Sequence, residues 1–167
     1  FPQLKNDIKT NIAIVGGGIT GVLCGYMLKQ QGIDCVILEA DRVCKGVTQN
    51  TTAKITSQHG LIYDKLIKNF GIEKAQMYLQ ANENALKKYI ELCTNIPCEF
   101  ERKDNYVYSV NNSKKINNEL HALVRLGYNP DFTTTIPVPI EIAGAVKFPN
   151  QAQFNPLQFL SHISKDL

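Results

Sequence analysis

The feature that most constrains this chain is a cluster of glycines between a short apolar segment and an amphipathic one. Residues 16–21 read Gly-Gly-Gly-Ile-Thr-Gly and fit the pattern G-x-G-x-x-G. They follow the β-branched run Asn11–Val15, which predicts a strand buried on both faces. A helix is predicted over Thr20–Gln31 and a second buried strand over Ile33–Leu38, with Gly32 ending the helix. This order predicts a βαβ unit with two parallel strands.

Each glycine of the pattern has a physical reason to be there. Gly16 lets the chain turn tightly out of the first strand, and Gly18 lets the backbone approach a pyrophosphate with no Cβ in the way. Gly21 and Gly25 let the helix pack closely on the strands. The first turn of the helix presents free N–H groups and the positive end of its dipole. The pattern therefore predicts a diphosphate site, with an ordinary tight strand-to-helix turn as the alternative.

An acidic residue at the end of the second predicted strand strengthens this interpretation. Glu39 lies eighteen residues after Gly21, near the spacing expected for an acid that binds a ribose. A carboxylate there accepts hydrogen bonds from ribose hydroxyls and repels a 2′-phosphate, so NADP is disfavoured. The alternative is a solvated carboxylate at a strand end. The βαβ pattern alone does not distinguish FAD from NAD.

The remainder of the chain mixes helical and strand patterns. Residues 40–58 are polar and predict a loop that runs into a helix rather than a third strand. Three helices and a hairpin with a Lys-Asp-Asn turn are predicted next, followed by one strand and one helix. In chain order these segments are Leu61–Phe70, a helix after Gly71, the hairpin strands Cys98–Glu101 and Tyr106–Val110, the helix Asn112–Leu126, the strand Ala143–Phe148 and the helix Pro156–Ser164.

Composition and charge exclude several classes of protein. The net charge of +3 comes from scattered lysines, so a nucleic-acid partner is not predicted. No apolar stretch approaches the roughly 20 residues of a membrane span. The five cysteines include no C-x-x-C pair and no Cys/His spacing typical of a metal site. We therefore expect free thiols, no metal and a reducing compartment, the cytoplasm.

The residues around and after Glu39 carry a family resemblance. Leu38–Arg42 followed by Gly46–Lys54 resembles the D-amino acid oxidase/glycine oxidase (DAO) superfamily of FAD-dependent oxidoreductases. Further matches extend the resemblance over nearly the whole chain, at Thr56–Leu61, Ala143–Val146 and Asn150–Phe154. The chain looks most like a bacterial subgroup in which the FAD domain is followed by a C-terminal Rieske [2Fe–2S] domain.

The resemblance implies an α/β fold and a division into domains. The expected architecture is a Rossmann-like FAD-binding domain of the GR2 type, present in part, with the beginning of an α+β substrate domain. Residues 1–95 would hold the βαβ unit and the helices after it, residues 96–142 part of the inserted substrate domain, and residues 143–167 a return to the FAD-binding domain. Because the chain contains no Rieske-type Cys-x-His pair, we expect it to be the N-terminal portion of a longer protein.

The resemblance also implies which residues bind FAD. Those expected at the pyrophosphate and ribose are Gly16, Gly18, Ile19, Thr20, Gly21, Glu39 and Ala40. Arg42 is implied near the adenosine half, and Thr48, Thr51, Thr52 and Ala53 along the pyrophosphate and flavin. Hydroxyls and backbone N–H groups suit phosphate oxygens and ring carbonyls. For the threonines the alternative is capping of a helix start.

The implied reaction is hydride removal from a carbon next to an amine, with a small amine or amino-acid-like substrate and electrons passed to a Rieske cluster absent from this chain. No catalytic residue is assigned. His59 and Lys54 are implied near the flavin edge, although a lone histidine is more often a packing residue. Tyr106 and Tyr108 share one face of a predicted strand, where core packing is expected. The competing functions are a non-catalytic dinucleotide-binding module and an NAD-dependent dehydrogenase, and no oligomeric state is predicted.

Overall fold

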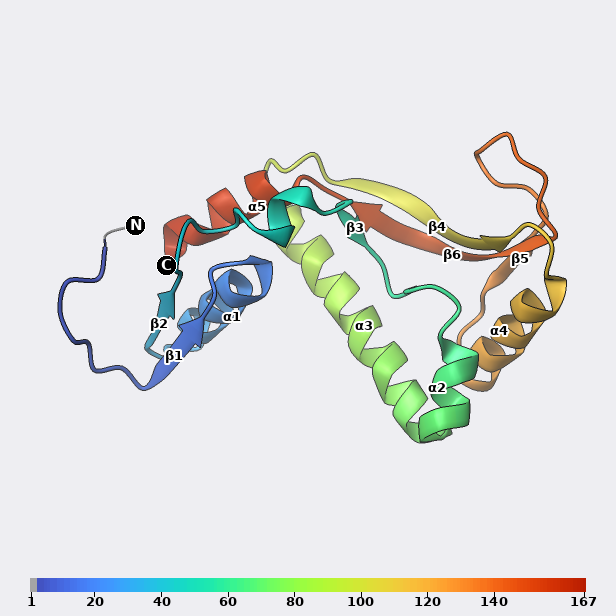
Figure 1. Cartoon of the computed structure of the whole chain (residues 1–167), viewed down its shortest axis with the longest axis horizontal. Coiled ribbons are helices and arrows are strands. Elements are labelled where there is room, and N and C mark those ends of the chain that lie inside the picture. Colours follow the sequence, from blue (N-terminus) through green and yellow to red (C-terminus); the bar gives the residue numbers. More distant parts are fainter. Residues whose placement is uncertain (1–2) are drawn as a thin grey trace. The chain divides into compact units, whose positions relative to one another are not determined.

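A computed structural model describes residues 3–167, which form two compact units. Unit 1 comprises residues 3–53, Ile96–Cys98 and Asn155–Leu167. Unit 2 comprises Lys54–Asn95 and Glu99–Phe154. Figure 1 labels the helices and strands of both units and colours them along the sequence.

Unit 1 contains the predicted βαβ arrangement. Strand β1 (Ile12–Val15) is followed by helix α1 (Ile19–Gln30) and strand β2 (Cys35–Leu38). The two strands are parallel, with Ile12 opposite Cys35 and Val15 opposite Leu38. Helix α5 (Pro156–Ile163) and a short 3-10 helix, η2 (Ser164–Asp166), pack against α1. The segments predicted as a strand, a helix and a strand are therefore confirmed, with ends shifted by one or two residues.

In the described part of unit 1, helix α1 covers one face of the sheet and the other face carries exposed side chains. Successive side chains of a strand point to opposite faces, and α1 covers the face that contains Ile37, whose side chain lies against Gly25. On the other face Val15 is 88% exposed and Leu38 is also exposed. The prediction that both strands are buried on both faces is therefore wrong for the described residues, because only one layer of helix lies on this two-stranded sheet.

The polar region after β2 contains more structure than the sequence predicts. A 3-10 helix, η1 (Val47–Asn50), lies in unit 1, and a two-residue strand, β3 (Lys54–Ile55), begins unit 2. A loop does run into a short helix, but the expectation that this region contains no third strand is wrong. Strand β3 exists because Lys54 and Ile55 pair with the distant residues Gln153 and Ala152, which local sequence does not reveal.

Unit 2 contains an antiparallel sheet in the order β3-β6-β4, with β5 also paired to β6. Its strands are β4 (Glu101–Ser109), β5 (Asp131–Thr133) and β6 (Gly144–Gln153). The predicted hairpin is wrong, because the residues from Glu101 through the expected turn to Ser109 form the single strand β4, which pairs with β6 instead. A register shift between Lys103 and Asn105 accommodates the residues expected to turn. Strand β5 lies between the predicted helix Asn112–Leu126 and the predicted strand Ala143–Phe148, where the sequence predicts no strand.

Three helices of unit 2 form its core with the sheet: α2 (Tyr63–Phe70), α3 (Ile72–Cys93) and α4 (Ser113–Arg125). Gly71, at φ +83°, separates α2 from α3, a backbone conformation that favours glycine. The buried core cluster consists of Tyr63, Ala75, Leu79, Ile116, Ala122, Leu123, Leu126, Val146 and Phe148. Contacts thus group α2 and α3 with the sheet rather than with the βαβ unit, while the assignment of residues 1–95, 96–142 and 143–167 to functional domains stays a prediction.

Candidate dinucleotide-binding site

The glycine cluster forms the turn between β1 and α1. Gly16 has φ +106°, in the region that glycine adopts without steric cost. A Cβ on Gly21 would lie 1.9 Å from the backbone oxygen of Gly16, so no other residue fits there. A Cβ on Gly25 would lie 2.7 Å from Ile37 Cδ1, which shows how closely α1 approaches β2. These glycines are required by the packing of the turn itself.

Gly18 differs from these glycines in what surrounds it. Its φ of −76° and ψ of −176° suit any residue. The nearest atom to an added Cβ would be Thr48 Oγ1 at 3.4 Å, an ordinary contact. Nothing within unit 1 therefore requires glycine at this position. The lack of a side chain leaves room beside the backbone for a group from outside the protein, as the diphosphate interpretation demands.

The first turn of α1 contains no side chain that would neutralise the positive end of the helix dipole. Gly18 is the N-cap residue and offers no side-chain oxygen, and the first turn contains no acidic residue. One N–H has a partner from elsewhere in unit 1, because Ile19 N donates to Thr48 Oγ1 at 3.1 Å. Thr48 is only 7% exposed. The positive end of the helix dipole is thus left available to an anion, with one hydroxyl fixed beside it.

Glu39 lies against the same turn. Its Oε2 accepts a hydrogen bond from Gly17 N at 2.7 Å, and its Oε1 accepts one from Asp41 N at 3.0 Å. Both N–H groups lower the pKa of the Glu39 carboxyl, and the Asp41 N–H has the larger effect. The side chain is therefore a stable carboxylate at the place where strand β2 ends and the glycine turn passes.

The loop after Glu39 folds back over the turn. Cys44 N donates to Gly17 O at 2.9 Å. Burial raises the pKa of the Cys44 thiol, and the negative charge of Glu39 raises it further. A Cβ on Gly17 would lie 3.1 Å from Glu39 Cβ and 3.2 Å from Val43 Cγ2. Sequence reasoning missed Gly17 and Cys44 as parts of this site. The run of three consecutive glycines was the one available signal for Gly17.

The structure brings half of the predicted site residues together at the glycine turn of unit 1. The turn, Glu39 and Thr48 are joined by the hydrogen bonds described above. Thr48 caps the start of α1 rather than the start of η1, whose N-cap Gly46 has no side-chain partner. The remaining predicted residues, Thr20, Ala40, Arg42, Thr51 and Thr52, are exposed, and Ala53, with φ +61°, is the last residue of unit 1. Contact of any of these residues with a cofactor stays a prediction.

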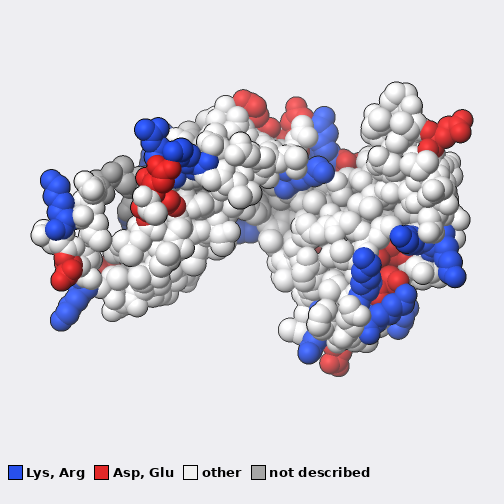
Figure 2. Space-filling view, in the orientation of Figure 1, with Lys and Arg blue, Asp and Glu red and all other residues white. Residues whose placement is uncertain are grey.

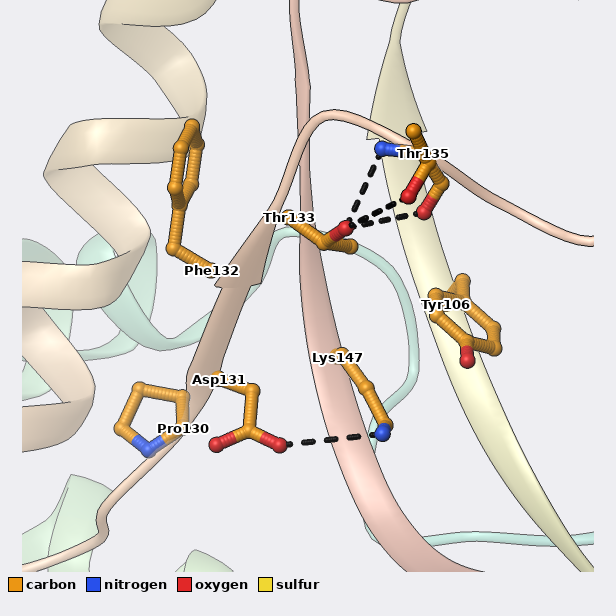
Figure 3. A pocket seen from close by; sticks show the side chains of 7 residues that line it. All are labelled: Tyr106, Pro130, Asp131, Phe132, Thr133, Thr135 and Lys147. Atoms are coloured by element: carbon orange, nitrogen blue, oxygen red, sulfur yellow. Dashed lines mark hydrogen bonds and ion pairs between the residues drawn. The ribbon is translucent and has the colours of Figure 1, made fainter.

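Unit 2 has a separate pocket of about 420 Å³ on the sheet (Figure 3). Lys147 on β6 lies opposite Tyr106 on β4 and opposite Asp131 on β5. The Lys147 ammonium lies 2.9 Å from Asp104 and 3.8 Å from Asp131. The pocket includes none of the predicted cofactor residues. Tyr108, two residues along the same face, is 45% exposed, so the expectation that it packs in the core is wrong.

The charges and helices of the described residues add three observations. On the face shown in Figure 2, basic and acidic side chains are interspersed rather than gathered into a patch of one sign. Within residues 3–167, no three His, Cys, Asp or Glu side chains come close enough to hold a metal ion. None of the helices in this part of the chain combines the length and apolar character needed to cross a membrane.

The fold of unit 1, with its turn and strand-end carboxylate, defines a protein of the dinucleotide-binding βαβ class. Within that class the sequence identifies the family. The family described as FAD dependent oxidoreductase (DAO) matches residues 11–167, so this chain belongs to that family.

Two relatives show how the resemblance is distributed. YhfW of Bacillus subtilis (strain 168), whose name describes it as a Rieske 2Fe-2S iron-sulfur protein, is 39% identical over 172 aligned residues. The alignment covers 100% of this chain and 34% of YhfW. Gamma-glutamylputrescine oxidoreductase of Escherichia coli (strain K12) is 30% identical over 46% of this chain and 18% of its own length. The chain thus spans about a third of the length of the first of these relatives.

Solved structures share the fold at low sequence identity. L-Proline dehydrogenase from P. horikoshii matches 95% of this chain and 41% of its own with a TM-score of 0.74 and 14% identity. Glycine oxidase from Geobacillus kaustophilus matches 94% of this chain and 44% of its own with a TM-score of 0.68 and 17% identity. These matches confirm the predicted Rossmann-like α/β fold, and the family match places that fold in the DAO family.

Proposed function

We propose that this chain is the FAD-binding portion of a flavin-dependent oxidoreductase that takes a hydride from a carbon bonded to nitrogen in a small amine or amino-acid-like donor. The observation that carries the proposal is the joint geometry of the glycine turn and Glu39. The turn leaves a space at Gly18 that the protein itself does not need, and Glu39 stands beside it as a carboxylate. Membership of the FAD dependent oxidoreductase family supports FAD over NAD.

The residues of unit 1 fit the diphosphate of FAD. Backbone N–H groups at the start of α1 would donate to the phosphate oxygens, which the dipole of the helix also attracts. The Thr48 hydroxyl accepts from Ile19 N, so its own hydrogen remains free to donate to a phosphate oxygen. FAD, when bound, supplies the acceptor for the hydride, and the protein contributes its position and surroundings.

Glu39 fits the adenosine ribose. Each of its oxygens accepts one backbone N–H and keeps a further lone pair, so both can accept from ribose hydroxyls. The two N–H groups hold the carboxylate in one orientation, which reduces the entropy lost on binding. Arg42 is proposed near the adenosine half, and Thr51, Thr52 and Ala53 along the pyrophosphate and flavin.

The names of the relatives support the donor and the electron acceptor. Gamma-glutamylputrescine oxidoreductase and glycine oxidase are named for nitrogen-containing compounds, and YhfW is named for a Rieske cluster. We accordingly propose that electrons pass from the flavin to a Rieske [2Fe–2S] cluster outside these 167 residues. We also propose a cytoplasmic location, since five cysteines without C-x-x-C spacing suit a reducing compartment.

The visible spectrum of the purified protein tests the proposal. Yellow protein with a flavin spectrum that bleaches when a small amine or amino acid is added would support a flavin-dependent oxidoreductase. Colourless protein that binds ADP-ribose compounds but never FAD would identify a non-catalytic dinucleotide-binding module. Protection against unfolding by NAD and not by FAD would overturn the assignment in favour of an NAD-dependent enzyme.

A further inference from the structure

The first residues of unit 2 after strand β3 are polar and yet buried. Ser57 is 0% exposed and Gln58 is 3% exposed. Burying polar groups is unfavourable unless each finds a hydrogen-bond partner. Strand β3 supplies few backbone partners, because only Lys54 and Ile55 are paired with β6. The conformation of residues 56–58 must therefore be determined mainly by side chains from other elements.

Ser57 is held through all three of its polar groups. Its N–H donates to Gln151 Oε1 at 2.8 Å, and its hydroxyl donates to Glu83 Oε1. Its carbonyl oxygen accepts a hydrogen bond from the Tyr63 hydroxyl. These partners come from β6, α3 and α2, respectively. Gln151 is itself buried, and its Nε2 donates to Pro149 O at 3.1 Å, which fixes the orientation of its amide.

Gln58 is held in a similar way. Its Nε2 donates to Val146 O at 3.1 Å, and its Oε1 accepts from Asn105 Nδ2 at 2.7 Å. Its backbone N–H donates to Thr56 Oγ1 at 3.0 Å. Among the described residues, no buried side-chain nitrogen or oxygen lacks a partner. A fully satisfied buried network of this kind gives a segment a single conformation.

The position of this segment along the chain gives the network its functional meaning. Residues 54–58 follow directly after Ala53, the last residue proposed to lie along the cofactor. Ala53 has φ +61°, a conformation that alanine adopts only when its surroundings impose it. Ser57, four residues after Ala53, fixes the chain on the C-terminal side of Ala53 through its hydrogen bonds. An anchor so close in sequence limits the conformations open to Thr51–Ala53.

We infer that Glu83 and Gln151 are positioning residues, which act through Ser57 to fix the segment that continues from the proposed cofactor-binding residues Thr51–Ala53. This inference rests on the proposed function, because it takes FAD as the ligand of those residues. Neither side chain is assigned a contact with the cofactor or the substrate. Both determine where the backbone leading away from the cofactor is held.

The test combines amide hydrogen exchange with FAD titration of the purified protein. Ser57→Ala and Glu83→Ala each remove one half of the same hydrogen bond. We expect exchange at residues 54–58 to accelerate about tenfold and the FAD dissociation constant to rise by about fivefold to tenfold in both variants. Glu83→Gln should restore much of the wild-type behaviour, because its amide oxygen still accepts from the Ser57 hydroxyl.

Asn112→Ala is the matched control. Asn112 Oδ1 accepts from Lys115 N at 3.1 Å at the start of α4, so this variant also loses one side-chain hydrogen bond of unit 2. It should destabilise the protein without changing exchange at residues 54–58 or the affinity for FAD. Equal loss of FAD affinity in Asn112→Ala and Ser57→Ala would mean that general destabilisation, and not positioning, explains the effect.

The outcomes separate this inference from the proposed function. Unchanged exchange at residues 54–58 in Ser57→Ala and Glu83→Ala would overturn the anchoring role. Faster exchange with unchanged FAD affinity would overturn the positioning role and leave the proposed function intact. If the unaltered protein fails to bind FAD, the proposed function and the cofactor part of this inference fall together, while the exchange data still decide whether Ser57 is the anchor.

Discussion

Replacing Gly18 by alanine separates cofactor binding from folding. The backbone at Gly18 is extended, and the added Cβ would meet nothing nearer than Thr48 Oγ1 at 3.4 Å. Gly→Ala changes at compatible positions stabilise proteins by about 0.4–1 kcal/mol, because they restrict the unfolded chain. The thermal unfolding midpoint of the cofactor-free variant should therefore equal or slightly exceed that of the unaltered protein.

The same methyl group should weaken FAD binding. It would occupy the space between the backbone and the diphosphate, so the phosphate oxygens could no longer approach the N–H groups at the start of α1. A hydrogen bond to a charged group contributes about 1.5–3 kcal/mol, and each 1.4 kcal/mol is about tenfold in affinity. Loss of one such bond predicts an FAD dissociation constant about 10- to 100-fold higher in Gly18→Ala.

Two further variants complete the experiment, with thermal unfolding and flavin fluorescence titration as the measurements. Gly21→Ala should lose both stability and binding, because its Cβ would lie 1.9 Å from the backbone oxygen of Gly16. Cys24→Ala, at an exposed position of α1, should change neither. If Gly18→Ala binds FAD as tightly as the unaltered protein, the diphosphate does not lie at this turn and the reasoning is refuted.

Three other predictions concern titratable and capping residues. Glu39→Gln should weaken FAD binding in fluorescence titrations. Because the pKa of Glu39 is lowered in the folded state, its carboxylate should stabilise the protein above the ordinary pKa of 4.5, and this stabilisation should be lost as pH falls through the folded-state pKa. Acid unfolding curves would show this loss in the unaltered protein and not in Glu39→Gln. Burial raises the pKa of Glu119, whose carboxylate accepts from Tyr63 N at 2.8 Å and Asp64 N at 3.0 Å. The free energy of unfolding should therefore decline as pH rises from 4.5 through that raised pKa, and this decline should be absent in Glu119→Gln. Glu119→Ala should lower the free energy of unfolding, measured with denaturant, by roughly 1–3 kcal/mol for each N–H group left buried without a partner. Asn112→Ala should lower the free energy of unfolding by about 1 kcal/mol, the usual value of an N-cap, and an unchanged value would show that the cap at α4 contributes nothing.

Local sequence was sufficient for the βαβ unit. Its strands, turn and helix are neighbours along the chain, and the glycines are required by contacts within the same short stretch, such as Gly21 against Gly16. Helices α2, α3, α4 and α5 were predictable for a similar reason. Their apolar spacing and their ends, such as Gly71 and the N-cap Asn112, are local signals. The place of Glu39 beside the turn followed from strand pairing within the unit.

The pairing of distant segments was decided by tertiary structure alone. Strand β4 looked like a hairpin because its charged middle resembles a turn, yet its partner β6 begins only at Gly144, 35 residues after β4 ends at Ser109. Strands β3 and β5 are too short to show a periodic pattern. The Thr48 hydroxyl on Ile19, the Glu119 carboxylate on α2 and the side chains around Ser57 all join segments far apart in sequence. The spacing of apolar residues and the residues of turns carry information about neighbours along the chain. Contacts between distant segments depend instead on which surfaces meet when the chain folds.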